Sequence, residues 1–515
     1  MQVYLLFWTK LRVSRCNDQM KEIYAPVVVI GSGIGGATTA LALAKRGIEV
    51  LVLERGGYLP QEPQNWSEQA IFKEKRYKPN ETWLDETGQE FVPGVHYFVG
   101  GNSKVYGASL PRFRKEDFEV MKHKEGVSPS WPFTYQDIEP YYCKAEEIYK
   151  VHSDSGIDPT EPARSRPFPF AALEHEPYVV SLKERLTNLG LHPFPNAMGI
   201  DIGPTGKCIR CSTCDGFVCM INAKSDAQTC ALNLALATGK VRLMTNCKVE
   251  RLIASDDGKR ITQAEVISDE GTSIVRADRF VLSAGSVNSA ALLLKSKVAN
   301  SSDQVGRNFM MHINSHIVAF DPRRKNDLTF QKTLSFNDWY FDGGKGYPLG
   351  AVQLIGKVTG AMMKSYATKI PLPILKYVAN HSVEFVLMTE DLPNSANRIT
   401  LTNQGKIQVF RTAIGMTSHL ELLKKTKKYL RKVGYMGIFR QEFDISMNSH
   451  QCGTLRAGSD PKTSVLNEYC KAHDLENLYV IDASFFPSSA AMNPALTIAA
   501  QALRVVAESD LANEL

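Results

Sequence analysis

The sequence predicts an α/β fold class, with a doubly wound, Rossmann-like dinucleotide-binding domain. Near the N-terminus a buried strand, a glycine-rich turn, a helix and a second strand follow one another within residues 25–54. Near the C-terminus a strand at 478–484 and a helix at 495–510 repeat this alternation. With 515 residues the chain is long enough to hold at least one further domain.

The N-terminal elements appear in the order that a dinucleotide-binding unit requires. Residues 25–30 are a short apolar run, which is typical of a parallel strand buried on both faces. Residues 37–46 have a helical pattern, and 48–53 form a second apolar strand that ends at Glu54. Between the first strand and the helix the sequence reads G-S-G-I-G-G, which matches G-x-G-x-x-G.

Each residue of this fingerprint has a physical reason. Gly31 permits the tight turn, Gly33 lets the backbone approach a pyrophosphate, and Gly36 lets the helix pack on the strand. The free N–H groups at the helix N-terminus attract phosphate. Glu54 lies 23 residues after Gly31, where an acid that binds the ribose is expected. The fingerprint alone leaves both FAD and NAD open.

The C-terminal block consists of two polar turns around a strand. His450 lies in a glycine-containing turn at 448–454, and Asp482 lies where the strand at 478–484 runs into a turn. Asn493 and Pro494 precede the helix 495–510. Asn is a good N-cap and Pro suits the first helical position, so both favour a helix start here.

Composition excludes several classes of protein. Apolar residues make up 43% and charged residues 22%, values typical of a soluble globular protein and not of a disordered or collagen-like chain. A net charge of +6 over this length is too weak to predict nucleic-acid binding. The longest uncharged stretch, 483–503, contains too many polar and proline residues to be a membrane span. Ten cysteines without a secretion signal favour a reducing compartment, and we expect a cytoplasmic protein.

Taken together, these motifs resemble the glucose–methanol–choline (GMC) oxidoreductases of bacterial type, a family of FAD-dependent alcohol oxidases and dehydrogenases. The resemblance covers most of the chain in order. It rests on the fingerprint at 29–54 and on five further segments: 99–103, 282–289, 305–308, 449–454 and 479–501.

The resemblance implies FAD as the cofactor and an α+β substrate domain with an antiparallel sheet. The loop after Gly101 is similar to that of pyranose oxidases, which attach FAD through a histidine. Val105 occupies the corresponding position here, so noncovalent FAD is expected. The cofactor-binding residues that the fingerprint and the resemblance imply are Gly31, Gly33, Gly36, Glu54, Gly100, Gly101, Asn102, Ser103, Val249 and Asp482.

The resemblance also implies a catalytic pair, His450 and Asn493, which lie 43 residues apart. A neutral imidazole can accept the hydroxyl proton of an alcohol, and an amide can stabilise the developing alkoxide. The carbinol hydride would pass to flavin N5. His312 lies where the family often has a histidine, and we interpret it as structural.

Four cysteines, Cys208, Cys211, Cys214 and Cys219, fall within twelve residues. Their spacing approaches that of a ferredoxin run but has a longer last gap and no proline. A zinc site usually has pairs of ligands separated by a longer loop. A structural or disulfide-capable loop is the main interpretation, and an iron–sulfur cluster and a zinc site are the alternatives.

The expected domains are discontinuous. The FAD-binding domain comprises 24–65, 92–115, 200–318 and 446–515, and the substrate domain comprises 116–199 and 319–445. Residues 66–91 connect them, and 1–23 are a disordered extension or follow an upstream start codon. Two strands, 382–389 and 398–401, are expected in the substrate sheet. The basic run 424–432 predicts an amphipathic helix with a solvated basic face, or one that docks on an acidic partner or a membrane surface.

The leading functional hypothesis is oxidation of a primary or secondary alcohol to the carbonyl. The resemblance favours a sugar, polyol or aminoglycoside-like substrate. Dioxygen, an electron-acceptor protein or a quinone would take the electrons. The alternatives are a non-redox lyase on the same scaffold and a dehydrogenase flavin subunit with an iron–sulfur cluster on the cysteine run.

Overall fold

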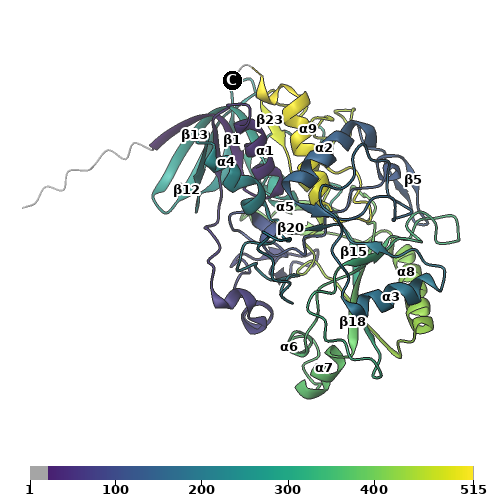
Figure 1. Ribbon diagram of the computed structural model, residues 1–515. Helices are drawn as coiled ribbons and strands as arrows, with labels where there is room; N and C mark the ends of the chain where they lie inside the picture. The colour runs from purple at the N-terminus through teal and green to yellow at the C-terminus, as the bar shows by residue number, and fades with distance from the viewer. Residues whose placement is uncertain (1–20, 514–515) are drawn as a thin grey trace, which may run out of the picture.

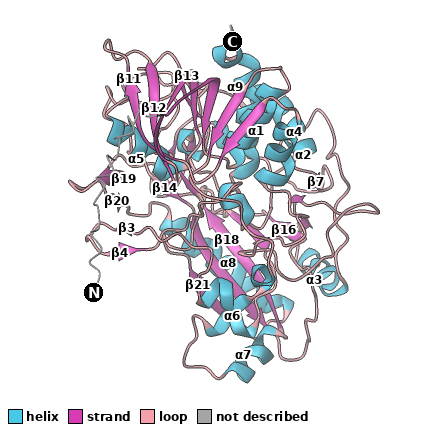
Figure 2. Ribbon diagram, turned by 90° about the vertical axis from the view of Figure 1, so that its left-hand side faces the viewer, coloured by secondary structure: helices cyan, strands magenta, loops and turns pink. Residues whose placement is uncertain are grey.

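The computed structural model describes residues 21–513, and its largest element is a seven-stranded sheet. The main path of this sheet runs β10-β2-β1-β13-β12-β11, and β23 pairs with the end of β13 (Figures 1 and 2). Strands β10, β2, β1, β13 and β23 are parallel, whereas β11 and β12 join as an antiparallel edge. The bounds are β1 Lys21–Ile30, β2 Val50–Leu53, β10 Val241–Met244, β11 Lys248–Ala254, β12 Ile261–Ser268, β13 Gly271–Leu282 and β23 Leu478–Val480.

Helices cover this sheet and confirm the predicted doubly wound arrangement. Helices α1 (Ile34–Ala44), α2 (Tyr135–Ile148), α4 (Asn233–Ala237) and α9 (Ala495–Glu508) contact one another in one layer, and α5 (Ser286–Ser296) packs against β11. The parallel strands read as unbroken apolar runs because both faces are buried: Val27, Val28 and Val29 have no exposed surface.

A second sheet is antiparallel throughout, with six strands in the order β21-β15-β18-β17-β16-β8. Helix α8 (Met416–Val433) packs against it, and α3 (Pro177–Thr187) packs on α8. This is the predicted α+β substrate domain. Its strands are β8 Phe194–Pro195, β15 Ile313–Phe320, β16 Leu334–Phe336, β17 Ala351–Leu354, β18 Ser382–Thr389 and β21 Gly437–Glu442.

The domain limits expected from the sequence differ from the structure at three places. Strand β1 begins at Lys21, so 21–23 are strand and not extension, and the expectation for 1–20 lies outside the described residues. The expected limit at residue 318 falls inside β15. Strand β19 (Arg398–Leu401) is not in the substrate sheet, because it pairs with β20 (Ile407–Phe410) in a small sheet with β3 and β4.

Several short elements complete the fold. A pair of short helices, α6 (Gly360–Lys364) and α7 (Leu372–Ala379), forms the end of the molecule farthest from the seven-stranded sheet in both views (Figures 1 and 2). None of the described helices is both long and apolar enough to cross a membrane. The remaining strands are β3 Trp83–Leu84, β4 Glu90–Phe91, β5 Met121–Lys122, β6 Val127–Ser128, β7 Val151–His152, β9 Met198–Gly199, β14 Met310–Met311 and β22 Gln451–Cys452.

Candidate active site

A cavity of about 440 Å³ extends from the carboxyl ends of β1, β2 and β13 to the turns that carry His450 and Asn493. This is where an open α/β sheet places its ligand. Eight of the ten predicted cofactor-binding residues line it: Gly31, Gly33, Glu54, Gly101, Asn102, Ser103, Val249 and Asp482. Gly36 and Gly100 do not line the cavity, but they belong to the two glycine-rich segments whose other residues line it.

The glycine fingerprint has the predicted geometry. Gly31 has φ +101°, and a Cβ there would lie 2.3 Å from the carbonyl oxygen of Ser283, so only glycine fits. A Cβ on Gly36 would lie 2.0 Å from the Gly31 carbonyl, so Gly36 allows helix α1 to sit close to the strand. A Cβ on Gly33 would meet no protein atom within 4 Å and would project into the cavity. The protein thus leaves at Gly33 the space that a pyrophosphate needs.

The two glycine-rich loops are tied together at the strand ends. The Gly100 N–H donates to Ser32 Oγ (3.0 Å), and Ser32 Oγ donates to the Glu54 carboxylate (2.6 Å). Glu54 also accepts from the backbone N–H groups of Ser32 and Gly56. Burial raises the pKa of Glu54, against these hydrogen bonds, which lower it. Glu54 therefore organises the loops in addition to lining the cavity.

Asp482 makes a similar connection further along the cavity. Its carboxylate accepts from the Gly285 N–H (2.9 Å) and Ser289 Oγ (2.6 Å) at the start of α5, and from the Ser484 N–H. It thus fixes the second helix N-terminus that faces the cavity. Burial raises its pKa, and the same hydrogen bonds oppose that shift.

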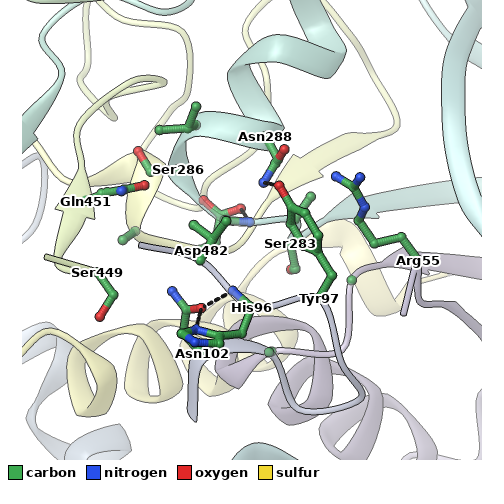
Figure 3. A pocket seen from close by; sticks show the side chains of 18 of the residues that line it. Arg55, His96, Tyr97, Asn102, Ser283, Ser286, Asn288, Ser449, Gln451 and Asp482 are labelled. Atoms are coloured by element: carbon green, nitrogen blue, oxygen red, sulfur yellow. Dashed lines mark hydrogen bonds between the residues drawn. The ribbon is translucent and has the colours of Figure 1, made fainter. Parts of the chain in front are cut away.

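Several residues that line the cavity were not predicted from the sequence as site residues (Figure 3). Arg55 stacks on the ring of Tyr97, with its guanidinium carbon 3.6 Å from the ring centroid, and Asn288 Nδ2 donates to the Tyr97 hydroxyl. His96 lies against Asn102, whose side-chain oxygen accepts from the His96 N–H (2.8 Å). Burial lowers the pKa of His96 to about 3. Arg55 follows the predicted Glu54 directly, and that position was the only signal available for it.

At the other end of the cavity, His450 faces a second histidine. The Nδ1 atoms of His312 and His450 lie 2.9 Å apart, with the rings nearly perpendicular at 85°. The Nε2 atom of His312 lies 2.9 Å from the carbonyl oxygen of Ser489. Asn448 links their backbones, because it donates to the His312 carbonyl and accepts from the His450 N–H. His312, interpreted as structural, is thus a direct partner of the predicted catalytic histidine.

These contacts fix which nitrogens carry protons. Burial lowers the pKa of His312, and burial together with His312 lowers that of His450 to about 3, so both rings are neutral near pH 7. A carbonyl only accepts, so His312 must carry its proton on Nε2, and its Nδ1 must then accept from His450 Nδ1–H. The remaining nitrogen of His450, Nε2, keeps its lone pair and has no hydrogen-bond partner among the described residues.

Asn493 lines the same cavity as His450. Its side-chain oxygen is buried and has no partner among the described residues. The sequence predicts Asn493 as the N-cap of α9, but in the structure the N-cap is Pro494. The Asn493 amide is therefore not engaged in capping. A buried amide oxygen without a partner at a cavity wall is the kind of acceptor that a ligand can satisfy.

In the part of the chain that the structure describes, the cysteine run is not gathered into a metal site. Within residues 21–513, no three His, Cys, Asp or Glu side chains come together to hold a metal ion. All nine described cysteines are free thiols. Instead the run belongs to a loop that packs on the cavity wall, where the Gly216 N–H donates to the carbonyl of Val105 (2.9 Å) and Lys224 Nζ donates to the carbonyls of Cys214 and Phe217. The iron–sulfur and zinc alternatives therefore find no support.

Comparison with known proteins identifies the family. Models of the GMC oxidoreductases match at residues 28–314 and 393–502. The chain belongs to the GMC oxidoreductase family. It is 30% identical over 511 residues to paromamine 6'-oxidase of Streptomyces fradiae, covering 93% of this chain and 90% of that protein. It is 26% identical to the fructose dehydrogenase large subunit of Gluconobacter japonicus, covering 94% and 97%.

The fold has solved counterparts as well. The crystal structure of pyridoxine 4-oxidase from Mesorbium loti superposes with a TM-score of 0.66 at 17% identity, covering 94% of this chain and 99% of that one. As a member of the GMC family, this protein is an FAD-dependent alcohol oxidoreductase. The cavity fits that cofactor, because its open space at Gly33 and its two helix N-termini suit a dinucleotide.

Proposed function

We propose that this protein oxidises a primary or secondary alcohol of a sugar, polyol or aminoglycoside-like compound, with His450 as the base and noncovalent FAD as the cofactor. One observation carries the proposal: the ring of His450 is neutral, held by His312 through Nδ1, and has an unpaired Nε2. The names of the relatives, which include a paromamine 6'-oxidase and a fructose dehydrogenase subunit, support a polar, polyhydroxylated substrate.

The chain supplies three actions in this reaction. His450 Nε2 accepts the hydroxyl proton, which increases the electron density at the carbinol carbon. Asn493, at the cavity wall, would donate its side-chain N–H to the alcohol oxygen and so stabilise the negative charge that develops there. His312 holds the reactive tautomer of His450 and, through Ser489, is fixed to the turn that carries Asn493. FAD, when bound, supplies the acceptor for the hydride.

The cofactor would be held by the residues at the strand ends. Gly33 and the start of α1 would face the pyrophosphate, Glu54 the ribose, and Val249 the adenine, as the family pattern implies. The position that carries the flavin link in some relatives is Val105, which cannot form one, so FAD would be released by denaturation.

The test is anaerobic flavin reduction in a stopped-flow spectrometer, with a panel of sugars, aminoglycosides and simple aliphatic alcohols. Bleaching of the flavin by a polyhydroxylated compound, more efficiently than by an aliphatic alcohol of similar size, is the expected result. A flavin that no alcohol in the panel reduces would contradict the proposal and favour the lyase alternative. Once the flavin is reduced, the rate of its reoxidation by air, compared with the rate with a quinone analogue, would identify the electron acceptor.

The role of His450 has its own test. His450→Ala removes the base without adding bulk, so FAD content is expected to stay unchanged. The reduction rate is expected to fall by about 10²- to 10⁴-fold, the usual contribution of general base catalysis. Normal reduction by this variant would remove His450 from the reaction.

A further inference from the structure

The α6–α7 tip exposes apolar side chains that the catalytic function does not use. Helix α7 buries Leu375 and Ala379 against the protein. On its outer side Ile374 and Tyr377 are 53% and 49% exposed, and Ile370, just before the helix, is 42% exposed. Residues three apart share a helix face, so Ile374 and Tyr377 point the same way.

The apolar surface extends onto the edge of the substrate sheet. The rings of Tyr377 and Phe320 are 6.1 Å apart, and a Cβ on Gly437 would touch the rings of both Phe320 and Phe439. Phe439 is 55% exposed. We call these four exposed residues, Ile370, Ile374, Tyr377 and Phe439, the tip surface. Apolar side chains gathered in this way on a soluble protein mark an interaction site.

Two lysines adjoin the tip surface in the sequence, since Lys369 precedes Ile370 and Lys376 precedes Tyr377. Lys369 and Lys376 are exposed, and neither forms an ion pair with another residue in the range 21–513. The Lys364 ammonium donates to the carbonyls of Thr368 and Ile370 in the loop before α7. The basic end of α8 is adjacent in the fold, since the Met436 N–H, just beyond this helix, is bonded to the Phe320 carbonyl.

We propose that the tip surface docks on an anionic lipid bilayer, with Ile370, Ile374, Tyr377 and Phe439 in the interfacial region and the lysines at the headgroups. Short amphipathic segments with apolar tips and flanking lysines bind membranes in this way. The position of α6 and α7 at the end of the molecule lets them reach a surface without obstruction (Figures 1 and 2). A protein partner fits less well, because lysine is depleted in protein–protein interfaces.

Co-sedimentation with vesicles tests this proposal on the full-length, FAD-loaded protein. Binding is expected to phosphatidylcholine vesicles that contain phosphatidylglycerol, to be weak without it, and to fall as salt rises. The double variant I370S/I374S is expected to lower partitioning by about tenfold. The double variant K369Q/K376Q is expected to lower it by about 25-fold, since each basic residue near the surface contributes about fivefold.

Matched controls keep the result interpretable. Leu234→Ser removes an apolar side chain that is 53% exposed on α4, and Lys259→Gln removes an exposed charge, both in the other domain. Neither is expected to change partitioning, and all variants should retain FAD and melting temperature. Failure to bind either vesicle would overturn the proposal. So would charge-dependent binding that persists unchanged in I370S/I374S, because it would show that the apolar tip does not enter the bilayer.

Discussion

Replacement of His312 by phenylalanine is the sharpest test of the site. The variant keeps the ring volume but removes the acceptor for His450 Nδ1–H, which lies in a buried environment. A buried donor without a partner costs about 1–3 kcal/mol, which is about a 5- to 150-fold shift in an equilibrium. His450 then favours the opposite tautomer, with its proton on Nε2, where it can no longer accept one from the substrate.

The measurement is the limiting rate of anaerobic flavin reduction. H312F is expected to lower this rate by about 5- to 150-fold while leaving KM within about twofold, because His312 acts through His450 and does not bind the alcohol. His312→Gln is the matched variant. Its amide can accept from His450 and donate to the Ser489 carbonyl, so it should recover most of the rate.

Flavin content and melting temperature separate this effect from misfolding, since Ser489 also loses a hydrogen bond in H312F. An unchanged reduction rate in correctly folded, FAD-loaded H312F would refute the tautomer argument. Equal losses in H312F and H312Q would refute it too, because the glutamine restores the hydrogen bonds and not the ring.

The remaining predictions concern acid, the cofactor and stability. Because the pKa of His450 is about 3, the reduction rate should be nearly unchanged from pH 8 to pH 5. A base with the ordinary histidine pKa of about 6.5 would instead lose about 30-fold in rate over this range, and a pH–rate profile distinguishes the two cases. Gly33→Ala should lower FAD content, read as the flavin-to-protein absorbance ratio, because the new Cβ enters the cavity, while Gly57→Ala should not, because its Cβ meets only the movable amide of Asn246. Acid precipitation should release all the flavin; colour that stays with the protein would indicate a covalent link, for which His96 at the cavity wall would be the first residue to test. Burial lowers the pKa of His316 to about 4, below its unfolded value, so the protein loses stability as pH falls from about 6.5 towards 4. At pH 5 this loss is about 2 kcal/mol. His316→Gln should therefore lessen the drop in melting temperature that acid causes.

The sequence was most informative where function depends on neighbouring residues. The turn at Gly31, the approach at Gly33 and the packing at Gly36 are local requirements, so their spacing predicts them and the structure has each one. The strands and helices of the FAD-binding domain can also be predicted from local patterns. Burial of parallel strands on both faces leaves an unbroken apolar run that spacing alone can detect.

Long-range contacts were harder to predict. His312 and His450 are 138 residues apart, and they meet only because β14, next to His312, pairs with β22, next to His450. No pattern in either segment signals the partner. Strand β19 shows the same limit. Its alternation correctly predicts a strand, but the sheet that it joins is decided by its pairing with β20, which in turn pairs with β3.

The histidine pair also explains how a buried imidazole could serve as the proposed base. Burial alone would favour the neutral ring but leave both tautomers accessible, and only one of them has a lone pair on Nε2. The Ser489 carbonyl removes this freedom, since it forces the proton of His312 onto Nε2 and so, through Nδ1, that of His450 onto its Nδ1. The same backbone turn continues to Asn493, so one short segment sets both the protonation of the base and the position of the group beside it. A disturbance of that turn should therefore reduce both functions together, whereas a substitution at Asn493 itself should leave the tautomer of His450 intact.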